Sequence, residues 1–154
     1  MSVMSPSSRD GRRWGWGPNE RGASRYHLQN ALEASLRRLQ SDHVDLYYVH
    51  RWDEDTPIEE TLRALDDAVR AGKVRYLGAS QFAAWQLARA HLLAEMRGWS
   101  SFVVRESHYH MLERQVELET LSCCRTLGVG FVPYFPLAGG FLTGKYRRGQ
   151  PAPP

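Results

Sequence analysis

The sequence predicts an α/β fold in which about four parallel strands alternate with helices. Short apolar runs rich in Val, Leu and Tyr recur along the chain, and segments with helical periodicity separate them. Strands joined by helices of three to four turns form parallel sheets. This alternating order of strands and helices fits half of a (β/α)8 barrel or a small doubly wound sheet. A complete barrel needs roughly 200–250 residues, so 154 are too few to close one in the usual way.

The first predicted helix spans residues 24–40 and leads into the first predicted strand, residues 44–50. Ser24 is a favourable N-cap residue. The buried stripe consists of leucines at helical spacing (Leu28, Leu32, Leu36 and Leu39). The strand ends at His50. Because parallel α/β folds place their chemistry at the carboxyl ends of strands, His50 is the first candidate functional residue.

The second predicted helix begins with a capping-box pair, Thr56 and Glu59, and ends at Gly72. A strand over residues 73–80 follows, in which Gly78 allows another chain segment to approach the backbone closely. The acidic residues before the helix are interpreted as a solvated loop (Asp53, Glu54 and Asp55).

Two further strand and helix pairs complete the pattern. The predicted ranges are helix 82–96, strand 102–106 with an extension toward Tyr109, helix 115–127 and strand 129–134. Pro133 and Pro136 end the last strand, because proline cannot donate a hydrogen bond to a sheet.

The two ends of the chain lack such patterns. We interpret residues 1–23 as a poorly ordered segment, residues 24–146 as the folded part and residues 147–154 as a flexible Pro-rich tail. The first residues lack the apolar core of a secretory signal, and no apolar run reaches membrane-spanning length. We therefore expect a cytoplasmic protein with no membrane partner.

Composition narrows the classes of partner. The net charge is +3, and the arginines occur in scattered pairs rather than in one stripe, so we expect no nucleic-acid partner. Cys123 and Cys124 are adjacent and point to different faces of a helix, which suits a reducing compartment better than a disulfide. We expect no metal site at His108 and His110, because no third ligand has suitable spacing.

Four motifs occur in order along the chain. They are GPNERGASR with EASLRRL (17–25 and 33–39), VDLY through to a histidine (44–50), GKVRYLGAS (72–80) and YFPLAGGFLTGKY (134–146). Together they resemble the aldo-keto reductase superfamily over about residues 17–146. The GGFLTGKY ending is similar to the branch that includes bacterial general stress-type reductases and potassium-channel β subunits.

The resemblance implies a partial (β/α)8 TIM barrel that binds NADP(H) at the carboxyl ends of its strands. It also implies hydride transfer between nicotinamide and a carbonyl or alcohol. In this family a Tyr is the general acid, helped by a Lys, an Asp and a His. His50 matches the His, and the other three match no residue here. Tyr48 shares the face of His50 by strand alternation and is the tyrosine to check.

The resemblance also implies cofactor-binding residues. Ser80 and Gln81 match a Ser-Asn pair that binds the nicotinamide carboxamide, and Tyr134 matches the aromatic that stacks on the ring. Glu106 stands where the family usually has Gln, and a carboxylate cannot donate a hydrogen bond unless it is protonated. The loop that wraps the pyrophosphate is matched by four residues (Leu137, Gly139, Gly140 and Lys145).

Three hypotheses follow from these observations. The first is an NADP-dependent oxidoreductase of the aldo-keto reductase type for a small carbonyl or alcohol substrate, incomplete and weakly active or inactive alone. The second is a non-catalytic module that binds the cofactor or another protein. Its open sheet edges would pair with another copy or a complementing chain. The third is a truncated reading frame that does not fold stably.

Overall fold

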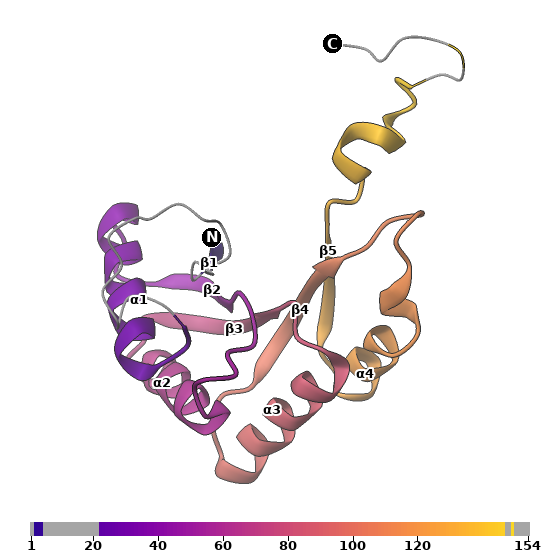
Figure 1. Cartoon of the computed structure of the whole chain (residues 1–154). Coiled ribbons are helices and arrows are strands. Elements are labelled where there is room, and N and C mark those ends of the chain that lie inside the picture. The colour runs from indigo at the N-terminus through magenta and orange to yellow at the C-terminus, as the bar shows by residue number, and fades with distance from the viewer. Residues whose placement is uncertain (1, 5–21, 147–148, 150–154) are drawn as a thin grey trace.

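The computed structural model describes residues 2–4, 22–146 and 149, and a parallel five-stranded sheet forms its centre (Figure 1). The strands lie side by side in chain order: β1 (Ser2–Met4), β2 (Val44–Val49), β3 (Val74–Ser80), β4 (Phe102–His108) and β5 (Gly130–Tyr134). The helices are α1 (Arg25–Leu39), α2 (Ile58–Arg70), α3 (Ala84–Arg97) and α4 (Thr120–Thr126), with short 3-10 helices η1 (Gln115–Glu117) and η2 (Ala138–Thr143).

The arrangement confirms the predicted α/β class and is consistent with part of a (β/α)8 barrel. Figure 1 shows the sheet curving like a section of barrel wall, with α1 to α4 along its outer side. One strand was not foreseen, since Ser2–Met4 pair with Leu46, Tyr47 and Tyr48 of β2. Three residues are too few to show strand alternation in a sequence. Residues 5–21 and the tail 147–154, apart from Gly149, lie outside the described residues.

The apolar core fills the space between the sheet and the helices. Tyr47 and Val49 of β2 and Leu77 and Ala79 of β3 belong to it, together with leucines of the helices (Leu28, Leu32, Leu62, Leu65 and Leu87). Successive side chains of a strand point to opposite faces. The residues between these core positions therefore lie on the other face of the sheet, which we call the inner face.

The start of α1 follows the prediction, whereas the predicted capping box of α2 is wrong. The Ser24 hydroxyl accepts a hydrogen bond from the His27 N–H. In α2 the N-cap residue is Pro57, whose backbone is extended, so Thr56 lies one residue too early to cap the helix. The Thr56 hydroxyl donates instead to the carboxylate of Asp53, at 2.7 Å.

Asp53 is therefore more than part of a solvated loop. Its Oδ2 also accepts the backbone N–H of Ala23, at 2.7 Å. Burial alone would raise the pKa of Asp53, but the hydrogen bonds from Thr56 and the backbone outweigh it and lower the pKa. Asp53 thus ties the loop after β2 to the start of α1.

The predicted helix over residues 115–127 is divided into η1 and α4. Glu119 between them has φ −139°, outside helical geometry. Glu117 accepts hydrogen bonds from the Tyr109 hydroxyl and, through both carboxylate oxygens, from Arg114. These contacts bind η1 to the loop after β4 and interrupt the helix.

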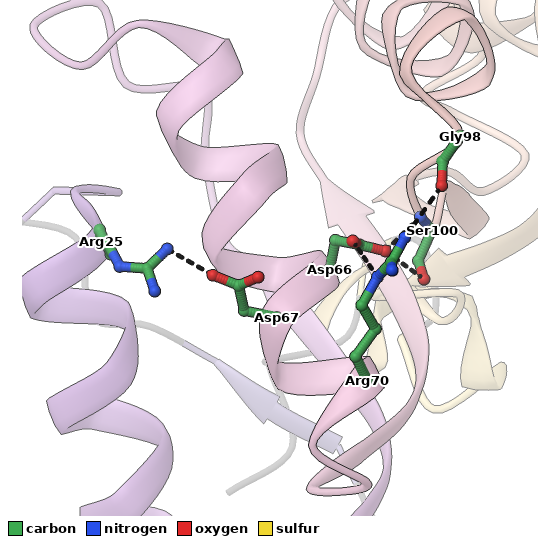
Figure 2. Close-up of polar contacts among 6 residues, drawn as sticks. All are labelled: Arg25, Asp66, Asp67, Arg70, Gly98 and Ser100. Carbon is green, nitrogen blue, oxygen red and sulfur yellow. Dashed lines mark hydrogen bonds and ion pairs between the residues drawn. The ribbon is translucent and has the colours of Figure 1, made fainter.

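Polar contacts join α2 to α1 on one side and to the residues before β4 on the other (Figure 2). The carboxylate of Asp66 in α2 accepts hydrogen bonds from both the backbone and the hydroxyl of Ser100 and from Arg70. Burial raises the pKa of Asp66, but these hydrogen bonds outweigh it, so the pKa lies below its usual value. Arg25 of α1 pairs with Asp67 on the opposite side of α2. The outer layer is thus joined from α1 through to the residues before β4.

Candidate functional site

The carboxyl ends of the strands bring three polar residues into one row on the inner face. Ser80 pairs in register with Glu106, and Val49 pairs with Ala79. His50 directly follows Val49, so it lies opposite Ser80. We call His50, Ser80 and Glu106 the polar row. Its members come from β3, β4 and the end of β2, so the sheet itself sets their spacing.

Two atoms of this row are buried and unpaired. Ser80 is 1% exposed, and its hydroxyl has no hydrogen-bond partner among the described residues. Nδ1 of His50 is likewise a buried atom without a hydrogen-bond partner among the described residues. Leaving a buried polar group unsatisfied costs about 1–3 kcal/mol. Such a cost is expected where a ligand supplies the missing partner.

Tyr48 lies on the same face, with its ring against the backbone of β3. A Cβ atom at Gly78 would stand 2.5 Å from two carbons of this ring, so only glycine fits at that position. Burial raises the pKa of Tyr48, and the negative charge of Glu106 raises it further. The Tyr48 hydroxyl therefore remains protonated and able to donate at neutral pH.

His50 is neutral at pH 7. Burial lowers its pKa, and the positive charge of Arg51 adds to this effect, while Glu106 opposes it only in part. A neutral imidazole has one N–H donor and one acceptor nitrogen. His50 can therefore donate a hydrogen bond to a carbonyl oxygen without carrying a charge.

The ends of β4 and β5 add an aromatic cluster. The ring of His108 stacks on Tyr134 with centroids 5.3 Å apart and planes 11° apart. His110 and Phe135 contact His108 edge to face. Nε2 of His108 is a third buried atom without a partner in the described part of the chain. Neither the stacking of His108 on Tyr134 nor its place beside the polar row is foreseen from the sequence. The two-residue spacing of His108 from Glu106 is the signal that places it on the inner face.

The other expected cofactor residues lie farther from the row. The side chain of Gln81 is exposed, and its backbone N–H donates to the carbonyl oxygen of Glu106. Figure 1 shows η2 extending beyond β5, away from β2 and β3. Of the four predicted loop residues, Gly139 and Gly140 lie within η2, Leu137 directly precedes it and Lys145 follows Gly144. Their backbone forms tight turns, in which Gly140 N–H donates to the Leu137 carbonyl.

Neither a metal cluster nor a membrane-spanning helix is found among the described residues. No group of three His, Cys, Asp or Glu side chains in this part of the chain is arranged to hold a metal ion. Among the same residues, no helix is both long enough and apolar enough to span a bilayer. The buried polar atoms without partners make the polar row and the aromatic cluster beside it the candidate functional site.

A family model and several known proteins match most of this chain. A family model described as "Aldo/keto reductase family" matches residues 13–154. The "Uncharacterized oxidoreductase YrpG" of Bacillus subtilis is 47% identical over 130 residues, which cover 84% of this chain and 40% of that protein.

Mammalian relatives match nearly the same part of the chain. The "Aldo-keto reductase family 7 member A3" of Homo sapiens is 46% identical over 78% of this chain and 36% of its own length. The "Aflatoxin B1 aldehyde reductase member 2" of Mus musculus is 46% identical over 78% of this chain and 33% of its own length. The chain thus spans about a third to two fifths of these relatives.

Proposed function

The chain belongs to the aldo/keto reductase family, and from this premise we propose that its inner face forms the nicotinamide-binding part of an NADP(H)-dependent oxidoreductase. The family supports an oxidoreductase. The substrate in this proposal is a small carbonyl or alcohol. We also propose a cytoplasmic location, because the adjacent thiols of Cys123 and Cys124 suit a reducing compartment.

The buried, unpaired hydroxyl of Ser80 is the observation that carries the proposal. A nicotinamide carboxamide offers both an acceptor oxygen and N–H donors. Ser80 can donate to the oxygen or accept from the N–H2 group, and Glu106 can accept from that group. Gln81 follows Ser80 directly and can supply an amide at the mouth of the site. The residues present therefore fit this end of the cofactor.

The remainder of the cofactor requires further contacts. His108 stacks on one face of the Tyr134 ring, so a nicotinamide ring would take the place of His108 to stack there. The positive φ of Gly139 (65°) and Gly140 (95°) allows a tight backbone turn, beside which Lys145 supplies a positive charge for a pyrophosphate. Because η2 extends away from the row, we propose that this segment folds toward the sheet when the cofactor binds.

In the proposed reaction the cofactor and His50 have separate roles. The bound cofactor would supply or accept a hydride. The N–H of neutral His50 would orient and polarise the substrate carbonyl. No residue matches the family's Tyr, Lys or Asp, and a positioned acid contributes roughly 10²–10⁴-fold. We therefore propose that the 154-residue polypeptide is weakly active or inactive alone.

A fluorescence titration of the purified chain with NADPH tests the proposal directly. We expect saturable binding that Ser80→Ala weakens by roughly 2- to 10-fold, the range for one net hydrogen bond. Ser122→Ala is the matched control, because Ser122 is exposed on α4 in the helix layer. Absence of saturable binding, or equal affinities of wild type and Ser80→Ala, would reject the proposal.

A second candidate function is a protein-interaction module. In the described sheet β5 pairs with β4 on one side and is the terminal strand on the other. Its inner-face residue Val132 is 42% exposed. An open strand edge invites pairing with another chain. In this alternative β5 joins a second copy or a complementing chain. Size-exclusion chromatography with light scattering decides it, since a monomer at all concentrations would count against pairing between copies.

A further inference from the structure

Glu106 is the charged member of the polar row and lies at its β4 end. The strand order β3-β4-β5 places it between Ser80 on one side and Val132 on the other, each in register with it. Two residues farther along, His108 of β4 is in register with Tyr134 of β5. Any flat ligand held by both Ser80 and Tyr134 must therefore cross β4 beside Glu106 and His108.

The spacing between strands brings a ligand that crosses β4 close to the Glu106 side chain. Neighbouring strands lie about 4.8 Å apart, so β3 and β5 are separated by roughly 10 Å. A nicotinamide with its carboxamide at Ser80 and its ring against Tyr134, in the place that His108 occupies in the structure, would span that gap. The ring would then lie within about 7 Å of the Glu106 side chain, allowing for the rise of two residues along the strand.

The charge of Glu106 is not neutralised on the inner face. Among the described residues no cationic side chain forms an ion pair with it. Its neighbour Arg105 is 4% exposed on the helix side, where it donates to the backbone carbonyls of Phe82 and Glu106. His50 is neutral because burial lowers its pKa, and Tyr48 is neutral because burial raises its pKa. His108 and Tyr134 are the next ionisable side chains on this face among the described residues.

The two redox forms of nicotinamide differ in charge at this position. The oxidised ring carries one positive charge, whereas the reduced ring is neutral, and the phosphates are the same in both. We propose that Glu106 makes the site prefer the oxidised over the reduced nicotinamide, a preference that an amide at this position would not create. This inference rests on the proposed function, because it requires the ring to bind across β4.

The magnitude follows from Coulomb's law. At about 7 Å and an effective dielectric constant between 20 and 80, one opposite charge favours the oxidised form by roughly 3- to 50-fold. The measured quantity is the ratio of the NADPH dissociation constant to that of NADP+. We expect Glu106→Gln to lower this ratio by that factor, and Glu106→Ala to lower it similarly.

The experiment is a binding measurement on the purified chain. NADPH affinity comes from fluorescence titration, and NADP+ affinity comes from displacement of NADPH. Glu119→Gln is the matched control, since it removes the same charge from an exposed position beside the groove between α3 and α4. We expect this control to leave the ratio unchanged. In wild type, raising the salt from 0.01 to 1 M shortens the screening length from about 30 to about 3 Å and should lower the ratio.

The outcomes separate this inference from the proposed function. Binding of both forms with a ratio that neither Glu106 variant lowers overturns the inference alone. If neither form binds to wild type, the proposed function and the inference both fail. Should the variants fail to fold, as judged by circular dichroism, a wild-type ratio that is insensitive to salt overturns the inference.

Discussion

The contact between Tyr48 and Gly78 supports a quantitative test of how the inner face is packed. A Cβ atom at Gly78 would lie 2.5 Å from Cδ1 and from Cε1 of Tyr48. Carbon atoms in contact are normally about 3.5–4.0 Å apart, so Gly78→Ala forces the ring or the strand to move by about 1 Å. Tyr48 is 4% exposed and has little space in which to move. Overpacking of this kind costs about 1–3 kcal/mol.

We expect Gly78→Ala to lower the midpoint of thermal unfolding by about 2–12 °C, from about 2–4 °C per kcal/mol for a chain of this size. Gly130→Ala is the matched control within the same sheet. Its Cβ would stand 3.5 Å from the nearest atom, the carbonyl oxygen of Val103, which is an ordinary contact. We therefore expect Gly130→Ala to change the free energy of unfolding by no more than about 0.5 kcal/mol.

A double-mutant cycle assigns the effect to the ring. In a Tyr48→Ala background the added methyl group meets no ring, so the penalty of Gly78→Ala should fall by at least about 1 kcal/mol. Urea unfolding of the four proteins measures this coupling. An equal penalty in both backgrounds, or a Gly78→Ala protein as stable as Gly130→Ala, would refute the reasoning.

Two further predictions concern acid stability and catalysis. Because the pKa of Asp66 is lowered on folding from 3.8, its stabilising contribution is present above pH 3.8 and is lost as the pH falls through the lower folded-state pKa. Asp66→Asn should therefore flatten the decline of stability with acid in urea unfolding between about pH 5 and pH 2, and an unchanged slope would contradict this. In an assay of carbonyl-dependent NADPH oxidation we expect little or no turnover by the isolated chain. Robust turnover that survives Tyr48→Phe with His50 intact would mean that another general acid exists.

Periodicity in the sequence was sufficient for the main architecture. The leucine stripe after Ser24 and the short apolar runs ending near His50 and Ser80 correspond to α1, β2 and β3. These patterns work because burial against one layer of helices imposes them on every strand. The helix layer and the parallel order follow from the same alternation.

Local hydrogen bonding was harder to foresee than periodicity. Thr56 and Glu59 have capping-box spacing, but the hydroxyl of Thr56 donates to the Asp53 carboxylate instead of capping α2. In the same way, Glu117 bonds to Tyr109 and Arg114 and divides a helix that periodicity treats as continuous. In each case a side chain a few residues away competes with the helical hydrogen bond, and capping-box spacing or periodicity does not show which partner is bonded.

The candidate site shows the same division. Strand alternation is enough to place Tyr48 and His50 on one face, and register then adds Ser80 and Glu106. The unpaired state of the Ser80 hydroxyl and the stacking of His108 on Tyr134 depend on three-dimensional packing. The position of η2 depends on contacts beyond the strand pattern, so sequence motifs alone could not place Lys145 relative to the row.

The strand order also has a consequence for how the molecule assembles. From β3 onward each strand pairs with the strand that precedes it in the chain, so each of these pairings closes a comparatively short loop. Short loops are closed at low entropic cost, and a chain emerging from the ribosome can add one strand and helix at a time. We expect the sheet to grow outward from β2 and β3 during synthesis. The amides of β5, which pairs with β4 alone in the described sheet, should exchange with solvent hydrogen sooner than those of β3, which pairs on both sides.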